Sequence, residues 1–256
     1  MKWRGDYLYL IQNLVLKDFR IRYRNMSLGV LWSLLNPLVM MGVLTFVFTQ
    51  IRIFRSPIAH FPLFVLCGMV PFNFFTIAWL SGTTSIVDNA GLIKRVPVPR
   101  EVVPITTVLA CCIHLLVQIL LLLMVALFSN LRLNIHWLWL PVLWFLEVVF
   151  VCGLALFSAS INVFIRDTRY VVESASLVLF WLVPVFYSSD VIPVQYRPII
   201  DYNPVATVVV SLRKILINAQ PLDASTLCKL IAVSVTAFAV GLSVFRRVKP
   251  RFYEHI

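Results

Sequence analysis

The chain consists of long apolar blocks separated by short polar stretches. Six blocks contain 19 or more residues each, and they cover residues 28–50, 61–82, 104–130, 138–161, 171–189 and 227–245. An α-helix rises 1.5 Å per residue, so about 20 apolar residues cross the hydrocarbon core of a bilayer. Because unpaired backbone groups cannot face lipid, each block must be helical. The pattern predicts an all-α integral membrane protein with six transmembrane helices and a single domain over residues 1–256.

The segment before the first block, residues 1–27, is amphipathic. Its apolar residues recur at helical spacing, namely Tyr7, Leu8, Ile11, Leu14, Val15 and Phe19. We expect an interfacial helix whose apolar face rests on the membrane. A basic cluster of Arg20, Arg22 and Arg24 follows. This cluster either anchors the helix to anionic lipids and sets the topology, or binds an anionic headgroup of a substrate.

Prolines interrupt the region between the fifth and sixth blocks, residues 190–226. Pro193, Pro198 and Pro204 divide it into pieces that are too short to span a bilayer. Asn203 followed by Pro204 is typical of a helix start, with Asn as the N-cap and Pro in the first turn. We therefore expect short re-entrant helices after the fifth block.

The loop between the second and third blocks, residues 83–103, is unusually structured. Ser85 with Asp88 fits a capping box, and Ile86 and Ile93 share one face of the helix that would follow over residues 85–93. The prolines after Arg95 predict a stiff, extended exit. The loop is either an interfacial turn resting on lipid or a lever that docks onto a partner protein.

Composition and charge narrow the class of protein. Hydrophobic residues make up 61% of the chain and charged residues 13%, about half of what soluble domains carry. With six spans, 15 of the 22 Lys and Arg residues fall on the side of the two termini and the loop 83–103. The positive-inside rule places that side in the cytoplasm. A nucleic-acid-binding role fits poorly, because the cations line one membrane face.

The chain lacks the motifs of nucleotide and catalytic sites. None of its eight glycines belongs to a GxxxxGK[ST] loop, there is no HExxH pair, and no Ser/His/Asp set is indicated by spacing. The five cysteines form no CxxC pair, and no cleavable signal peptide is evident. We expect no metal or cofactor on this chain. If transport here uses ATP, another chain must bind it.

A few polar and aromatic residues inside the blocks are candidates for function. Glu147 is either a proton carrier or a structural partner, and His114 with Gln118 is expected to join helices. Aromatic residues gather at the end of the fifth block, namely Phe180, Trp181, Phe186 and Tyr187, with Tyr196 and Tyr202 beyond it. They form either an interfacial aromatic belt or a row of rings on which sugars stack along a translocation path.

Seven strings spread over nearly the whole chain carry a family resemblance. They are LGVLWSLLNPL (28–38), LFVLCGMVPFNFF (63–75), NAGLIKRVPVPREVVPI (89–105), NVFIRDTRYVVE (162–173), LFWLVPVFYS (179–188), YNPVATVVVSLRKIL (202–216) and FRRVKPRFYEHI (245–256). In these strings the chain resembles the membrane subunits of ABC-2 type exporters. Within that family it is similar to those that move O-antigen, other polysaccharides, or polyol phosphates such as teichoic acids.

The resemblance implies a homodimer in the bacterial inner membrane, joined to two copies of an ABC ATPase that binds ATP and Mg²⁺. It implies a channel between subunits, lined by spans one and five, for a lipid-linked polysaccharide. It also assigns roles to residues of this chain. Coupling to the ATPase falls to Ser85, Ile86, Asp88, Asn89, Leu92, Ile93, Lys94 and Arg95; the external gate falls to Tyr196, Tyr202, Asn203 and Pro204.

Two alternatives to a polysaccharide exporter remain open at this point. One is an ABC-2 permease for teichoic acid, a drug or another small substrate, which would share the fold. The other is a proton-coupled transporter that uses Glu147. A membrane-embedded enzyme is disfavoured, because the sequence offers no catalytic constellation.

Overall fold

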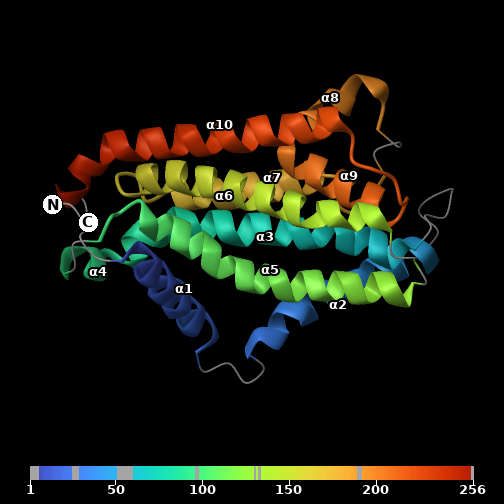
Figure 1. The fold of residues 1–256 in the computed structure, drawn as a ribbon, viewed down its shortest axis with the longest axis horizontal. Coiled ribbons are helices and arrows are strands. Elements are labelled where there is room, and N and C mark those ends of the chain that lie inside the picture. The colour runs from blue at the N-terminus through green and yellow to red at the C-terminus, as the bar shows by residue number, and fades with distance from the viewer. Residues whose placement is uncertain are drawn as a thin grey trace.

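The computed structural model describes residues 6–24, 29–50, 60–95, 98–129, 131, 134–188 and 192–254. Within these ranges the chain is helical, with connecting turns and no strand. Four long helices lie side by side: α3 (Phe61–Asp88), α5 (Val102–Phe128), α6 (Leu140–Asn162) and α10 (Ala224–Val248) (Figure 1). This arrangement confirms the expected all-α membrane fold.

The central helix of the bundle is α3. Its most apolar stretch is 72% buried, whereas that of α2 (Trp32–Gln50) is 11% buried and that of α10 is 17% buried. A helix that is apolar all round belongs in a core or in a membrane. Helix α3 contributes several of the largest fully buried side chains, including Leu63, Leu66, Phe74 and Phe75. The outer faces of α2 and α10 therefore remain apolar and uncovered.

Small residues let α6 and α10 approach closely. A β-carbon added to Gly153 would lie 2.5 Å from backbone atoms of Ala237 and Phe238, and one added to Gly241 would overlap the Gly153 carbonyl. Lipid tails are as apolar as side chains, so close backbone packing through glycine is a main source of helix association in membranes. This contact fixes α10 against the rest of the bundle.

Among the described residues, five helices are long and apolar enough to cross a bilayer, and they match predicted spans one to four and six. Span one is α2, preceded by a 3₁₀ turn, η1 (Gly29–Leu31), and span four is η2 (Ile135–Trp139) followed by α6. The chain is therefore a multi-pass membrane protein, and the count of six spans stays a prediction.

The fifth predicted span, residues 171–189, is shorter in the structure. Its helix, α7 (Thr168–Leu182), has 15 residues, and Val183 is already extended, with φ −80° and ψ 133°. The cause is Pro184, because the residue before a proline is driven out of the helical region. Residues 183–188 form a non-helical turn packed against the bundle, with Val183 and Val185 fully buried.

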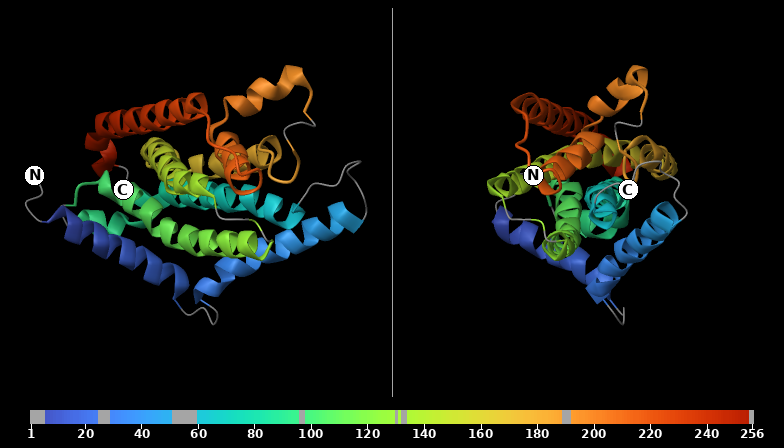
Figure 2. Two further views of the ribbon diagram at one scale, coloured as in Figure 1. Left: turned by 45° about the vertical axis from the view of Figure 1, so that its right-hand side comes forward. Right: turned by 90° about the vertical axis from the view of Figure 1, so that its right-hand side faces the viewer.

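A helix in the N-terminal segment is confirmed as α1 (Tyr7–Tyr23), which begins at an N-cap formed by Asp6. Its buried residue is Leu14, while Tyr7 and Leu8 are 50% and 64% exposed. The helix packs on α5. Helices α1 and α2 diverge as a V on one side of the bundle (Figures 1 and 2).

Between α7 and α10 the described chain forms η4 (Val194–Tyr196), α8 (Arg197–Asp201) and α9 (Pro204–Leu216). The predicted helix start is confirmed: the Asn203 side chain accepts hydrogen bonds from the backbone N–H groups of Val205 (3.0 Å) and Ala206 (3.4 Å), and Pro204 is the first residue of α9. Helix α9 is amphipathic, and its apolar face is buried against α3.

The capping box at Ser85 was wrong. Helix α3 continues to Asp88, breaks at Asn89, and is followed by the short helix α4 (Ala90–Arg95). Ser85 lies inside α3, where its hydroxyl donates to the Gly82 carbonyl at 2.7 Å. The reason is burial: Ile86 is fully buried, and this packing extends α3 beyond the predicted end of span two.

Candidate functional site

The first candidate region is the coupling corner, which we define as residues 85–95 at the junction of α3 and α4. Its apolar residues Ile86 and Ile93 lie in the core with Leu14, and Ser85 is buried as well. Asn89 and Leu92 are half-buried. The exposed members of the predicted coupling set are Asp88, Lys94 and Arg95. A partner that docks here would meet charged side chains rather than the isoleucines.

Polar contacts tie α1 to this corner. The Lys17 ammonium donates to the side-chain oxygen of Asn89, whose amide nitrogen donates to the Ser85 carbonyl at 2.8 Å. One residue further along α1, Asp18 accepts a hydrogen bond of 2.9 Å from the Thr107 hydroxyl on α5. Helix α1 is therefore fixed to the end of α3 and to the first turns of α5.

The structure separates the three arginines of the basic cluster. Arg22 points into the bundle, where its guanidinium donates to Ser81 Oγ (3.1 Å) and Cys111 Sγ (3.3 Å). Arg20 and Arg24 lie on another face of α1, where they line an open cavity of about 470 Å³. Two of the three predicted headgroup residues are thus brought together, and Arg22 instead joins α1 to α3 and α5.

His114 and Gln118 on α5 connect three helices, as expected for residues that join helices. The Tyr23 hydroxyl of α1 lies 2.9 Å from His114 Nδ1. Gln118 Nε2 donates to the Ser33 carbonyl of α2 (3.2 Å) and lies 3.1 Å from His114 Nε2.

The C-terminal end of α10 reaches the start of α5 at the same end of the bundle as α4 (Figure 1). Lys249 donates to the Glu101 carboxylate at 2.6 Å, and Arg100 donates to the Lys249 carbonyl at 2.8 Å. Burial alone would raise the pKa of Glu101, but the hydrogen bond from Lys249 and the nearby positive charges hold that pKa below its usual value. This ion pair joins the end of α10 to the start of α5.

The second candidate region is the aromatic corner, which we define as Phe180, Trp181, Phe186 and Tyr187. The structure brings all four together: the ring centroids of Phe180 and Trp181 are 5.7 Å apart, those of Trp181 and Phe186 5.6 Å, and those of Phe186 and Tyr187 5.4 Å. Phe72 of α3 and Phe48 of α2 pack on the cluster from behind. Trp181 is 62% exposed, so the corner presents an open ring face.

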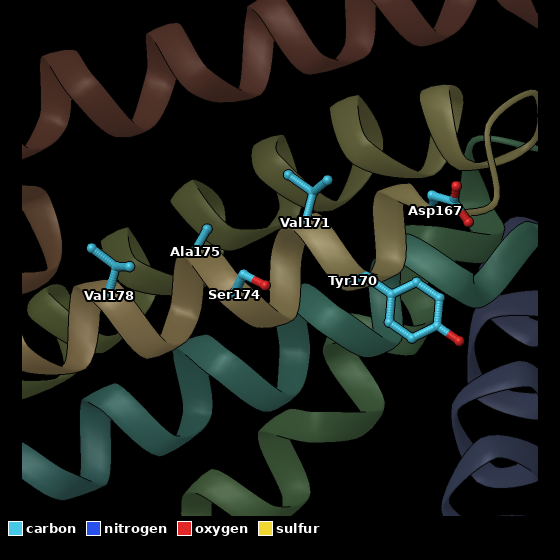
Figure 3. A pocket seen from close by; sticks show the side chains of 6 residues that line it. All are labelled: Asp167, Tyr170, Val171, Ser174, Ala175 and Val178. Carbon is cyan, nitrogen blue, oxygen red and sulfur yellow. The ribbon is translucent and has the colours of Figure 1, made fainter.

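An open groove of about 740 Å³ runs along the outer side of α7 (Figure 3). The residues that line it are Asp167, Tyr170, Val171, Ser174, Ala175 and Val178. Ser174 and Ala175 are small and lie in its middle, and the aromatic corner follows at the end of α7. The groove offers an uncovered wall of mixed polarity rather than an enclosed pocket for a small ligand.

The predicted gate residues lie beyond the aromatic corner. Tyr196 and Tyr202 are exposed, at 53% and 77%, and the Lys229 ammonium of α10 lies 5.8 Å from the ring centroid of Tyr202. Asn203 caps the N-terminus of α9, and Pro204 is the first residue of that helix. No described contact joins these tyrosines to the rings of the aromatic corner, so the two sets are separate in this conformation.

Glu147 on α6 is 2% exposed, and neither of its carboxylate oxygens has a hydrogen-bond partner among the described residues. It borders a cavity of about 10 Å³ with Pro204 and Val205 of α9 and Ser234 of α10. The described residues contain no group of three metal-ligating side chains. They also place no second acid beside Glu147 that could relay a proton.

Sequence reasoning did not single out Arg213, which directly follows an apolar run. The structure buries this residue against α3 and the turn after α7. The signal was present in the spacing, because Ala206, Val209 and Leu216 lie seven and four residues before and three residues after it and share its buried face. Asp18 of α1, whose carboxylate accepts the hydrogen bond from Thr107, was missed as well.

Comparisons with known proteins agree with this architecture. The profile of the ABC-2 type transporter family matches residues 9–217. The chain is 30% identical to an O-antigen export system permease protein of Klebsiella pneumoniae, over 99% of this chain and 98% of the relative.

More distant relatives cover most of the chain as well. An O-antigen export system permease protein of Myxococcus xanthus is 28% identical over 98% of this chain and 96% of its own length. A polysialic acid transport protein of Escherichia coli is 25% identical over 92% of both chains. Together with the family match and the bundle of membrane helices, these similarities establish that the chain belongs to the ABC-2 type transporter family.

Proposed function

We propose that the chain is the membrane-spanning permease subunit of an ATP-driven exporter, and that it moves a lipid-linked polysaccharide out of the cytoplasm. The observation that carries the proposal is the uncovered side of α7, where a long groove leads to four clustered aromatic rings. Sugar rings have apolar faces that pack on aromatic rings. The relatives are named for O-antigen export and polysialic acid transport, which points to the same class of substrate.

The path would lie between two copies of the chain. A single subunit leaves the groove of α7 open on one side and the apolar faces of α2 and α10 uncovered. Apolar faces toward lipid need no cover, but a polar polymer must be shielded from the bilayer core. A second subunit across the groove would complete that shield, so we infer a homodimer.

The energy source would be a separate ABC ATPase, in two copies, that binds ATP and Mg²⁺ and docks at the coupling corner. Three exposed residues support this assignment, Asp88, Lys94 and Arg95. The contact of Lys17 with Asn89 connects this corner to α1, and the contact of Lys249 with Glu101 joins the end of α10 to the start of α5 at the same end of the bundle. Both termini and the corner would face the cytoplasm of the bacterial inner membrane, as the distribution of cations indicates.

The anionic headgroup of the substrate would be met by Arg20 and Arg24, which line the cavity on the outer side of α1. A lipid diphosphate carries negative charge and accepts several hydrogen bonds, which suits two guanidinium groups on one helix face. Arg22 would not take part directly, because its guanidinium is engaged with Ser81 and Cys111.

A bulky residue in the groove tests the proposed path. Ala175→Trp should block surface display of the polymer in cells that synthesise it, while the permease still inserts and binds its ATPase. Val235→Trp on α10, a residue that is 56% exposed, is the matched control and should export normally. Normal export by Ala175→Trp would remove α7 from the path. The readout is surface polymer measured by antibody labelling of intact cells.

The main competitor is a proton-coupled transporter that uses Glu147. The Glu147 side chain is buried and has no hydrogen-bond partner among the described residues, which favours a neutral carboxyl over a charged one. A glutamine has nearly the same shape and polarity as a neutral carboxyl. We therefore expect Glu147→Gln to retain export. Loss of export in Glu147→Gln, with normal expression and ATPase binding, would favour proton coupling over the proposed mechanism.

A further inference from the structure

Arg213 is the most heavily bonded cation inside the described bundle. It lies on the buried face of α9, is 7% exposed, and is surrounded by apolar side chains of α9 such as Val209 and Leu216. No salt bridge to it exists among the described residues. An arginine in such a place needs acceptors, because a buried charge without partners is strongly unfavourable.

Among the described residues, all of its hydrogen-bond acceptors are backbone carbonyls. Nε donates to the Phe64 carbonyl of α3 at 3.2 Å, Nη1 to the Tyr187 carbonyl at 3.3 Å, and Nη2 to the Val185 carbonyl at 2.6 Å. The guanidinium carbon also lies 3.5 Å from the ring centroid of Phe64. The planar fork of arginine can serve several acceptors at once, which a lysine ammonium on its single atom cannot match here.

Two of these carbonyls are available because α7 ends early. Pro184 stops the helix at Leu182, so the carbonyls of residues 183–188 have no helical partners. Free carbonyls at this depth must be satisfied by protein. Arg213 supplies the donors for Val185 and Tyr187 from a different helix, and so holds the turn in its extended form.

Gly68 on α3 shows that the turn needs a close approach. A β-carbon at this position would lie 2.6 Å from the Val185 carbonyl oxygen and 3.0 Å from Arg213 Nη2. Only glycine leaves room for the carbonyl and the guanidinium together. The contact between α3, α9 and the turn therefore depends on Gly68 from α3 and on Arg213 from α9.

The turn after α7 also fixes the positions of the rings in the aromatic corner. Tyr187 is held at its carbonyl by Arg213, and its hydroxyl donates back to the carbonyls of Trp181 (3.0 Å) and Leu182 (3.3 Å). Hydrogen bonds therefore hold the segment from Trp181 to Tyr187 at both of its ends. If the bonds from Arg213 are removed, the turn loses its attachment to α9, and only the Tyr187 hydroxyl bonds and the ring contacts still restrict where Phe186 and Tyr187 face.

We propose that Arg213 is a positioning residue: from the re-entrant helix α9 it holds the broken end of span five, so that the aromatic corner presents its rings to the passing polysaccharide. The inference rests on the proposed function. It adds a physical link between the external gate region and the rings, because α9 cannot shift without moving the turn.

The test compares Arg213→Met and Arg213→Lys with Lys214→Met in the permease–ATPase complex. Lys214 pairs with Asp223 near the surface and is the matched control. We expect both Arg213 variants to assemble, to show at least tenfold faster amide hydrogen exchange in residues 183–188 with unchanged exchange in α6, and to lose at least tenfold in export rate. The Lys214→Met variant should match the unmodified protein in both measurements.

Unchanged exchange in the turn of Arg213→Met, or normal export despite faster exchange, would overturn the inference. If Arg213→Met does not insert, Tyr187→Phe keeps the ring and Arg213 but removes the hydroxyl bonds, and it should raise exchange in residues 182–188 and lower export. Unchanged exchange in that variant would equally overturn it. Failure of the proposed function has a separate signature, namely export that survives Phe186→Ala with the Arg213 contacts intact.

Discussion

The contact between α6 and α10 offers a sharp test of the packing. A β-carbon on Gly153 would lie 2.5 Å from the backbone of Ala237 and Phe238. Non-bonded carbon atoms normally keep about 3.5–4.0 Å. Since the obstructing atoms are backbone, no side chain can turn away, and the two helices would have to separate by roughly 1 Å.

Gly153→Ala should therefore destabilise the permease, although alanine is the better helix former. Overpacking of this kind costs about 1–3 kcal/mol, whereas the gain in helix propensity is at most about 1 kcal/mol. After that gain is subtracted, the net loss is up to about 2 kcal/mol, which lowers the apparent Tm by up to about 8 °C for a chain of this size. The assay is thermal unfolding of the purified permease in detergent, followed by the loss of its monodisperse chromatographic peak.

Gly42→Ala is the matched control. Gly42 lies inside α2, and a β-carbon there would meet nothing within 4 Å. Its Tm should stay the same or rise slightly, because only the propensity term remains. Equal Tm values for Gly153→Ala and Gly42→Ala would refute the close helix contact and the reasoning from it.

Two further predictions concern the coupling end. Lys94→Glu with Arg95→Glu should abolish co-purification of the ATPase while the permease stays folded, and Arg197→Glu on exposed α8 at the other end should not; retention of the ATPase by the double variant would exclude this docking surface. Glu101→Gln should lower Tm at pH 7, because the carboxylate pairs with Lys249 at 2.6 Å. The depressed pKa of Glu101 means that this stabilisation is present above the unfolded pKa near ~4.3 and is lost as pH falls through the lower folded value, so the Tm deficit should shrink in acid; a constant deficit would contradict it.

Much of the fold could be predicted because its rules are local. The apolar blocks correspond to helices, and Asn203 with Pro204 starts α9 through side-chain and backbone chemistry within a few residues. The early end of α7 at Pro184 follows from an equally local rule, which the length of the apolar block concealed. The existence of the helices was therefore predictable, whereas the length of the apolar block concealed the early end of α7.

The parts that were not predictable depend on contacts between distant segments. The Ser85 pattern reads as a capping box, but packing of Ile86 against α1 and α5 extends α3 through it. Arg22 lies on the face of α1 that carries Phe19, three residues before it, so helical spacing already turns it away from Arg20. Its partners Ser81 and Cys111 come from distant parts of the sequence and could not be predicted. The spacing of its apolar neighbours places Arg213 on the buried face of α9, but its acceptors could be identified only once the carbonyls of the turn after α7 were located.

The most direct test of the central claim measures surface polysaccharide in a bacterial host that makes a lipid-linked polymer but lacks its own exporter. The account predicts that surface polymer appears when the permease and an ABC ATPase partner are expressed together, and not with the permease alone or with an ATPase unable to hydrolyse ATP. Export by the permease without a functional ATPase, abolished by Glu147→Gln, would contradict the account.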